Sequence, residues 1–305
     1  MNAKSEFAIR LSLICLTILA DCLFVVSIHA ERPPFKVFTT ADGLAHDSVN
    51  RIVRDSRGFL WFCTAEGLSR FDGSQFKNYT QNQGLPHRNV NDFLETQDGV
   101  YFVATNQGLS VFNPHGRAYR WNVRESTLEQ NGSEPPLFQT FVPANADTRQ
   151  KKNILTLAQT ADGSIWAGTI DGLFRVEKNG AEWRFIPFNP EGWQANRTVS
   201  TLFADTKGNL LVGTGVIIAA DGKWEKFDVL EAASIMEDRD GRIWVGAGGS
   251  DAGLRVFENE NNSLKIVKTY KKADGLMDEG FQFALTQTAD GRIYIGTDKY
   301  RTNVR

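Results

Sequence analysis

The sequence predicts an all-β protein: a β-propeller of about six blades, each a four-stranded antiparallel sheet, with the last blade incomplete. Two observations predict this fold. First, a short motif recurs six times along the 305 residues, in which an acid and a glycine precede an aromatic or aliphatic strand. Second, the chain holds 27 glycines, 7 tryptophans and 21 phenylalanines but only 3 methionines, a composition that favours short strands and tight turns over helical bundles.

The clearest copy of the motif is "DSRGFLWFCTAEGLSRFDG", which runs from Asp55 to Gly73. An acid and a glycine suit a tight chain reversal, because the carboxylate accepts hydrogen bonds from nearby backbone amides and the glycine adopts positive φ. The copies recur at spacings close to the roughly 40–50 residues of a propeller blade. Since every copy has an acid, we interpret it as a turn residue and not as a single catalytic acid. The residues predicted to carry the repeat are Asp55, Gly58, Trp61, Gly99, Tyr101, Gly163, Trp166, Gly208, Gly241, Trp244, Gly291 and Tyr294.

Each unit is predicted to be a meander of four strands. In the first full unit, an alternating run at 49–53 leads through the turn to an aromatic strand, and the stretches at 67–71 and 76–79 form the third and outer strands. The Trp or Tyr of the second strand is expected to wedge between neighbouring blades. Cys63 lies on the same strand and is interpreted as a small core residue, because a reactive thiolate needs an accessible, electropositive site.

Two further stretches complete the assignment of residues 31–305 to the propeller. Residues 35–38 have the pattern of an outer strand with no preceding strands, so we expect them to pair with the last blade and close the ring. Residues 113–150 contain several prolines and an Asn-Gly pair, which predicts an inserted loop. That loop is either a solvated excursion or a cover over one propeller face that contributes to a binding site.

The N-terminal residues 1–30 are predicted to be a signal peptide or an N-terminal membrane segment. Lys4 and Arg10 precede an apolar stretch at 11–28, and a small residue, Ala30, marks the expected cleavage point. Asp21 interrupts the apolar stretch, which argues against a permanent span. An uncleaved anchor and lipidation at Cys22 are the alternatives.

The charge distribution excludes one class of partner. The formal net charge is −2, and acids and bases are scattered along the chain without a basic run. Such a chain has no patch that would release counterions from a phosphate backbone. Nucleic acid is therefore not an expected partner.

The repeats resemble the two-component regulator propeller repeat, whose pattern is approximately Asp-x-x-Gly-x-hydrophobic-Trp-hydrophobic-Gly-Thr-x-x-Gly-Leu. The resemblance rests on the copy quoted above, on "DGSIWAGTIDGLFRV" and "DGRIWVGAGGSDAGLRVF", and on Gly-Leu connectors at 43–44, 84–85 and 275–276. Two copies depart from the pattern. Leu211 stands where the fourth copy should have tryptophan, and Ala104 replaces the glycine of the second copy.

The resemblance implies an extracytoplasmic ligand-sensing domain of a two-component signal transduction system, periplasmic or secreted, with no catalytic activity and no cofactor in this chain. It implies a small molecule or an oligosaccharide as ligand, since some such propellers sense carbohydrate fragments, and a homodimer as in sensor kinases. Contact with the membrane is expected only through the N-terminal segment. Full-length relatives carry a histidine kinase module, of which this sequence shows no motif.

His46 and His87 occupy equivalent connector positions that enter the innermost strands of adjacent blades, on the face where propellers commonly bind ligands. The predicted ligand-binding residues are His46, Asp47, His87, Arg88, Asn89, Asp278, Glu279, Glu66, Asn106 and Asp171. The alternative interpretation is that these residues only solvate loops. A metal site is not predicted, because two histidines would need further ligands and no closely spaced ligand motif is present.

Three other functions stay open at this point. One is a lyase that uses His46 or His87 as its base. Another is a glycoside-active enzyme with paired carboxylates, although the repeated acids are predicted to lie on the opposite face. The last is a structural or protein-binding scaffold, a role that ring folds often serve. Replacing His46 separates these functions. Loss of turnover would indicate an enzyme, loss of ligand affinity a sensor, and no effect a scaffold.

Overall fold

The computed structural model describes residues 36–114, 136–144, 152–180, 182–191, 197–227, 232–247, 253–260, 263–276 and 282–297. The chain divides into two units, Met1–Val37 and Phe38–Arg305, and the second unit holds all of the strands given below. The predicted signal segment at 1–30 lies outside the described residues. The part of the chain that is described contains no helix long and apolar enough to cross a membrane.

The first three sheets each have four antiparallel strands in sequential order. The first sheet is β1 (Val49–Arg54), β2 (Leu60–Thr64), β3 (Gly67–Phe71) and β4 (Phe76–Tyr79). The second is β5 (Val90–Glu95), β6 (Tyr101–Thr105), β7 (Gly108–Phe112) and β8 (Phe138–Phe141). The third is β9 (Ile154–Gln159), β10 (Ile165–Thr169), β11 (Gly172–Asn179) and β12 (Glu182–Pro187).

The next two sheets repeat the same order, and the sixth has two strands among the described residues. The fourth sheet is β13 (Leu202–Ala204), β14 (Leu210–Val212), β15 (Val216–Ile218) and β16 (Trp224–Lys226). The fifth is β17 (Ala232–Glu237), β18 (Ile243–Ala247), β19 (Gly253–Glu260) and β20 (Ser263–Tyr270), and the sixth is β21 (Gln282–Gln287) and β22 (Ile293–Thr297). Short 3-10 turns, η1 (Thr40–Asp42), η2 (Gln81–Gln83) and η5 (Lys272–Asp274), form three connectors.

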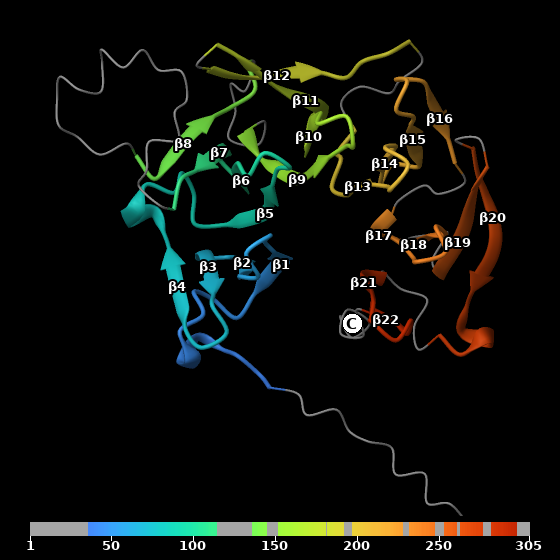
Figure 1. The fold of residues 1–305 in the computed structure, drawn as a ribbon, viewed down its shortest axis with the longest axis horizontal. Helices are drawn as coiled ribbons and strands as arrows, with labels where there is room; N and C mark the ends of the chain where they lie inside the picture. Colours follow the sequence, from blue (N-terminus) through green and yellow to red (C-terminus); the bar gives the residue numbers. More distant parts are fainter. Residues whose placement is uncertain are drawn as a thin grey trace, which may run out of the picture. The chain divides into compact units, whose positions relative to one another are not determined.

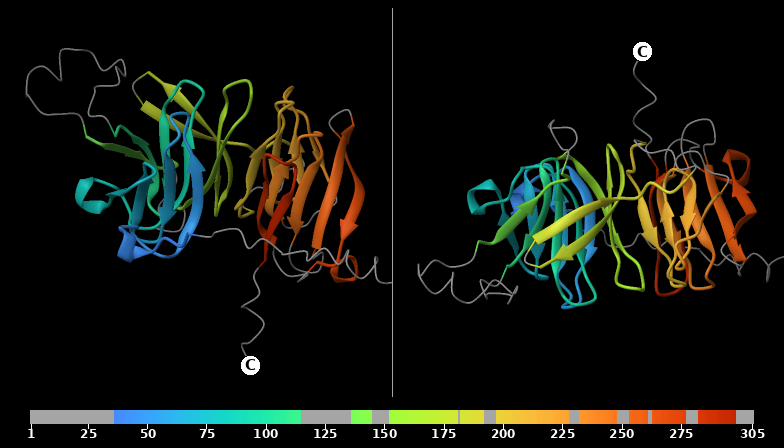
Figure 2. Two further views of the ribbon diagram at one scale, coloured as in Figure 1. Left: turned by 60° about the horizontal axis from the view of Figure 1, so that its bottom comes forward. Right: turned by 90° about the horizontal axis from the view of Figure 1, so that it is seen from above.

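The sheets are the blades of a propeller. The first strands of successive sheets, β1, β5, β9, β13, β17 and β21, contact one another in turn, and Figure 1 shows them innermost while the fourth strands lie outermost. Two further views, turned by 60° and 90°, show the strands of the same sheets along their length (Figure 2). The prediction of an all-β propeller with an incomplete last blade is thereby confirmed.

One turn geometry joins the first and second strands of all six sheets. The amide of each turn glycine donates to the carbonyl of the residue three positions earlier, as Gly58 does to Asp55 (3.0 Å) and Gly291 to Thr288 (2.9 Å). Gly58 has φ 89°, a left-handed conformation that glycine adopts without steric cost. The prediction that the repeated acid builds a turn is therefore confirmed.

The acid occupies either of two positions in this turn. In the first, fourth and fifth sheets it is the first turn residue, Asp55, Asp205 or Asp238, and one of its oxygens accepts two backbone amides of the same turn. In the other sheets the first turn residue is threonine, whose hydroxyl donates to an aspartate two residues later, as Thr160 does to Asp162. Both arrangements satisfy the turn's polar groups.

The first turn residue also holds the aromatic side chain of the second strand. The indole Nε1 of Trp61 donates to Asp55 (2.9 Å), and the equivalent nitrogen of Trp166 donates to Thr160 (3.3 Å). Trp61 is fully buried and stacks on Phe93 of the next blade, with ring centroids 4.8 Å apart. The predicted wedge between neighbouring blades is thus present.

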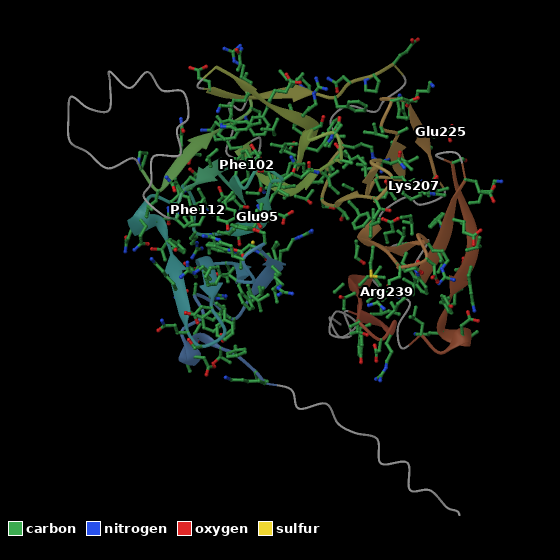
Figure 3. The ribbon with its side chains drawn as sticks, viewed as in Figure 1. Glu95, Phe102, Phe112, Lys207, Glu225 and Arg239 are labelled. Atoms are coloured by element: carbon green, nitrogen blue, oxygen red, sulfur yellow. The ribbon has the colours of Figure 1, made fainter. Side chains whose placement is uncertain are left out.

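The wedge residue of the second blade is Phe102 and not Tyr101, which corrects the sequence prediction. Phe102, labelled in Figure 3, stands three residues after its turn glycine, as Trp61 does. Its ring packs against Trp183 of the third blade. Tyr101 faces the first blade, where its hydroxyl donates to Asp55 (3.0 Å). The motif alone does not distinguish the two positions, because both side chains are aromatic.

The residue two positions after each wedge residue is glycine, alanine or cysteine. The close packing at this place explains the small size. A Cβ on Gly168 would lie 2.5 Å from the Val199 carbonyl oxygen, which belongs to the segment entering the next blade. A Cβ on Gly213 would lie 2.8 Å from the Thr201 side chain. Ala104 fits at the same place in the second blade, which accounts for that departure from the motif, and Cys63 occupies it in the first blade with no exposed area.

Two predictions about the chain's irregular parts need revision. Residues 36–39 form no strand, and the Phe38 ring instead packs on Phe71 and Phe76 of the first blade, with centroids 5.0 and 5.6 Å away. The predicted pairing with the last blade is therefore wrong for these residues. The stretch predicted as an inserted loop at 113–150 contains β8, the outer strand of the second blade; residues 115–135 and 145–150 lie outside the described part.

Replacing Asp55 tests the turn-and-wedge contact. We expect Asp55→Ala to lower the free energy of unfolding by roughly 1–3 kcal/mol, because buried donors lose their acceptor. Asp55→Asn keeps one oxygen for the turn amides and should cost less. Urea unfolding followed by tryptophan fluorescence measures both, and equal stability of Asp55→Ala and the unmodified protein would contradict the assignment.

Gly168→Ala tests the close approach between blades. Its methyl group would press on backbone, so we expect a loss of about 1–3 kcal/mol, which is typical of overpacking. Cys63→Ala places an alanine at the equivalent position of the first blade and serves as the control. Calorimetric Tm values should fall further for Gly168→Ala than for this control; the reverse order would refute the steric explanation.

Candidate functional site

The candidate site lies where the connectors enter the inner strands of the first three blades, at the opposite end of the blades from the Asp–Gly turns. The turns between second and third strands, such as the one holding Glu66, reach the same end because the strands alternate in direction. We call this end the connector face. Most of the predicted ligand-binding residues belong to it.

The two predicted histidines have the same local role. His46 Nδ1 accepts the amide of Ser48 (2.9 Å), and His87 Nδ1 accepts the amide of Asn89 (3.0 Å). Each imidazole therefore caps the chain as it enters an inner strand, and Nδ1 is committed as an acceptor. His46 is half-buried and His87 is buried, with 8% of its surface exposed.

The charged residues predicted for the site divide into one cross-blade pair and two local ones. Arg88 forms an ion pair with Glu66 (2.5 Å), which joins the second connector to the first blade. Asp47 accepts the amide of Thr40 (2.7 Å) within the first connector. The amide of Asp171 donates to Thr169 Oγ1 (3.0 Å) in a turn of the third blade. Asp278 and Glu279 lie outside the described residues.

A β-bulge at the start of each of the first two inner strands, β1 and β5, aims an asparagine side chain across the seam to the next blade. The register shifts between Val49 and Arg51 and again between Val90 and Asp92, so Asn50 and Asn91 are the extra residues. A bulged residue has no direct partner on the neighbouring strand, and the bend redirects its side chain. The irregularity thus gives each asparagine access to the next blade.

Both bulge asparagines bind the next blade's backbone. Asn50 Nδ2 donates to the carbonyl of Val90, and Asn91 Nδ2 donates to the carbonyl of Ile154, both at 2.7 Å. Each bond therefore crosses one seam at the connector face. These contacts are structural staples, and they hold the rest of a larger amide cluster in place.

The amide cluster comprises Asn50, Asn89, Asn91, Asn106 and Asn153, which come from three blades. Asn91 Nδ2 is also 2.9 Å from the Oδ1 atoms of Asn106 and Asn153, and Asn89 Nδ2 lies 2.6 Å from Asn91 Oδ1. The Nδ2 groups of Asn106 and Asn153 have no hydrogen-bond partner in the described part of the chain. They are the donors that a bound molecule could use.

The structure therefore brings together some predicted site residues and adds others. Asn89 and Asn106 contact each other, and Arg88 and Glu66 form a pair, whereas Asp47 and Asp171 are engaged in their own turns. Sequence reasoning missed Asn50, Asn91 and Asn153. The available signal was the repetition of asparagine as the second residue of the first two inner strands.

A buried carboxylate lies beneath this cluster on β5. Asp92 has 1% of its surface exposed, pairs with Arg51 of β1 (3.0 Å) and accepts the amide of Leu157 of β9 (2.8 Å). Burial raises its pKa, although Arg51 opposes that effect. Burial likewise raises the pKa of the Cys63 thiol, with a further contribution from Asp92. Asp92 thus ties three blades together, and Cys63 is a protonated core residue as predicted.

No three histidine, cysteine, aspartate or glutamate side chains gather closely enough to hold a metal ion among the described residues. The groups on the connector face are amides, one ion pair and two capping imidazoles. This arrangement can bind a polar molecule through directed hydrogen bonds. The repeated aspartates cannot contribute, because they are bonded into turns at the opposite end.

Comparison with known proteins supports the family resemblance. The two-component regulator propeller model matches residues 43–66 and 229–249. No curated protein matches the sequence. The extracellular domain of BT3049 from B. thetaiotaomicron, described as a hybrid two-component system, is 20% identical with a TM-score of 0.62; the match covers 86% of this chain and 34% of that one. This chain thus spans about a third of the length of that extracellular domain.

Two other solved propellers have the same fold. Virginiamycin B lyase from Staphylococcus aureus is 13% identical over 81% of this chain and 77% of the lyase, with a TM-score of 0.58. The β-propeller domain of Cps50 (Swd1) from Myceliophteria thermophila is 12% identical over 81% and 79% of the two chains, with a TM-score of 0.55. At these identities the likeness shows the fold alone. The chain is thus a β-propeller in which two stretches, 43–66 and 229–249, match the two-component regulator propeller model.

Proposed function

We propose that this propeller is the extracytoplasmic ligand-sensing domain of a two-component signal transduction system and is itself non-catalytic. The matched repeats and the likeness to an extracellular domain of a hybrid two-component system support the proposal. In this proposal residues 1–30 direct export, the domain acts in the periplasm or outside the cell, and a homodimer couples it to a histidine kinase module.

The amide cluster is the observation that carries the proposal. It joins three blades at the connector face, and the Nδ2 groups of Asn106 and Asn153 keep free donors. Both side chains are half-buried, so a ligand that binds them loses little to competing water. The bulge staples fix the positions of these donors before any ligand arrives, which reduces the entropy lost on binding.

The chemistry of the cluster suits an uncharged, hydroxyl-rich ligand. Amides offer both donors and acceptors without net charge, and each hydroxyl group of a saccharide can do the same. The Arg88–Glu66 pair adds charged hydrogen-bonding groups at one side of the cluster. We therefore propose an oligosaccharide as the ligand class.

A lyase is the second candidate, and the observation in its favour is the oriented pair of imidazoles. Nδ1 of His46 and of His87 accepts a backbone amide. In the neutral imidazole Nε2 then carries the proton, so Nε2 of His46 would serve as a general acid and not as the base predicted from the sequence. The likeness to virginiamycin B lyase concerns the fold alone. A glycoside-active enzyme has less support, since the repeated carboxylates lie at the Asp–Gly turn end.

Ligand-dependent melting tests the sensor proposal. We expect one member of an oligosaccharide panel to raise the Tm of the full chain, because a ligand that binds only the native state stabilises it. Asn106→Ala and Asn153→Ala should weaken binding by roughly 5–20-fold, the equivalent of one lost hydrogen bond, while leaving the Tm of the ligand-free protein nearly unchanged. Isothermal titration calorimetry gives the affinities.

Two controls separate binding from folding. Asn91→Ala removes a staple and should lower the Tm of the ligand-free protein as well. Asn179→Ala, at the end of β11 away from the connector face, should change neither quantity. Undiminished affinity in Asn106→Ala and Asn153→Ala would refute the cluster as the site, and turnover that disappears in His46→Ala would favour the lyase.

A further inference from the structure

At the Asp–Gly turn end, the same hydrogen bond recurs between neighbouring blades, and we call it the latch. Among the described residues, the boundary between the third and fourth blades lacks it. The second residue of each turn donates its amide to the side chain that ends the next inner strand. The latched pairs among the described residues are Ser56 with Glu95, Gln97 with Gln159, Thr206 with Glu237, and Arg239 with Gln287. Between the third and fourth blades the equivalent residues are Ala161 and Ala204, and a methyl group cannot accept that amide.

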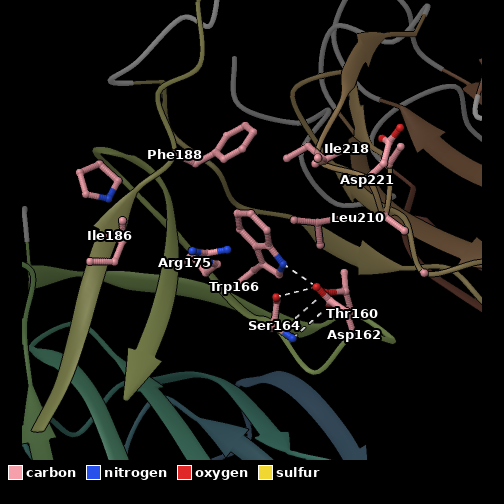
Figure 4. A pocket seen from close by; sticks show the side chains of 15 residues that line it. Thr160, Asp162, Ser164, Trp166, Arg175, Ile186, Phe188, Leu210, Ile218 and Asp221 are labelled. Atoms are coloured by element: carbon pink, nitrogen blue, oxygen red, sulfur yellow. Dashed lines mark hydrogen bonds between the residues drawn. The ribbon is translucent and has the colours of Figure 1, made fainter. Parts of the chain in front are cut away.

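The seam between the third and fourth blades is also uneven. β11 and β12 have eight and six residues, whereas each strand of the fourth blade has three. The longer strands therefore extend past the shorter ones. A cavity of about 430 Å³ lies between them, lined at its turn end by Asp162, Ser164 and Asp221 (Figure 4). That volume is within the range of small-molecule sites.

The inner wall of this cavity is apolar and includes aromatic rings. Trp166, Leu210 and Ile218 form its buried part, and Phe188 packs edge-on to Trp166 with ring centroids 5.5 Å apart. Ile186 at the rim is 41% exposed. Such a surface favours a ligand with an aromatic or aliphatic body.

The rim carries negative charge from both blades. Asp162 and Asp221 are exposed, and hydrogen bonds hold the pKa of each below its usual value, from the Thr160 hydroxyl to Asp162 and from Lys223 to Asp221. Both carboxylates are therefore ionised at neutral pH.

The basic groups at the cavity already have acidic partners. Arg175, the one cation in the lining, pairs with Glu177. Lys223 pairs with Asp221 (2.8 Å), but its side chain is 85% exposed, so this pair is weak and open to exchange. Asp162 receives only neutral donors, from Thr160 and Ser164. Within the described residues, the carboxylate of Asp162 is thus left without a cation.

We propose that the cavity between the third and fourth blades is a second binding site, which takes a small organic amine with an apolar body. The body contacts Trp166, Leu210 and Ile218, and the ammonium group binds Asp162, with Asp221 on the opposite wall. The site lies at the Asp–Gly turn end, away from the amide cluster, and does not depend on the proposed sensing of oligosaccharides.

Three probes of equal body and different charge test the proposal on the full chain: phenethylamine, 2-phenylethanol and 3-phenylpropionate. Binding is followed by the indole N–H resonance of Trp166 in a ¹⁵N–¹H spectrum, which Trp166→Phe identifies among the seven tryptophans. We expect phenethylamine to shift this resonance and to bind about 3–10-fold tighter than the alcohol, as one partly screened charge pair allows. The propionate should bind least, and added salt should reduce the preference.

Asp162→Asn should bring the affinities of the amine and the alcohol together. Asp98→Asn is the matched control, because Asp98 occupies the same turn position in the second blade, accepts from Thr96 in the same way, and lies outside the cavity. It should preserve the preference. Asp221→Asn gives a second variant if Asp162→Asn fails to fold. Equal affinity for all three probes, or an undiminished preference for the amine in both cavity variants, would overturn the proposal.

Discussion

The rest of this propeller depends on the hydrogen bonds made by the side chain of the first residue in each Asp–Gly turn. In the first blade Asp55 accepts two turn amides, the indole of Trp61 and the hydroxyl of Tyr101 from the second blade. One carboxylate thus closes a turn, orients a wedge and joins a neighbour. Because a buried unpaired indole or amide costs free energy, the position demands an acceptor, and aspartate or threonine supplies it.

The two ends of each blade therefore differ in how much their polar residues vary from blade to blade. The Asp–Gly turn end is repeated, and its acids carry the hydrogen bonds of the turns. At the connector face the polar groups differ between blades, and β-bulges aim Asn50 and Asn91 across the seams. Function in propellers is carried by such variable sites on a repeated frame. The amide cluster fits that division, since its members come from three blades and no single repeat contains it.

The seams are likewise not equivalent. Where a turn amide meets Glu95 or Glu237, two blades are joined by a charge-assisted hydrogen bond. Where the equivalent residues are Ala161 and Ala204, no side chain can accept the turn amide, and a cavity lies beside the short fourth blade. A cavity in a repeat protein can therefore arise from local loss of a repeated contact. The loss shows in the sequence only once the equivalent residues are known.

The sequence by itself determined the repeat, the strand order within each blade, the turn role of Asp55 and the core position of Cys63, because these follow from local spacing and residue chemistry. It also placed His46, His87, Asn89 and Asn106 near one face. It could not distinguish Tyr101 from Phe102 as the wedge, since register decides which of two adjacent aromatics faces the next blade.

Only the tertiary structure decided the contacts between blades. Asn91 and Asn153 are 62 positions apart, and their contact exists because a bulge on β5 meets the start of β9. The place of Phe38 on the first blade was decided in the same way, by ring packing that outweighed a strand-like pattern. A local sequence pattern does not specify which distant side chains meet between neighbouring blades. The amide cluster is made of such contacts, so only the folded chain defines it.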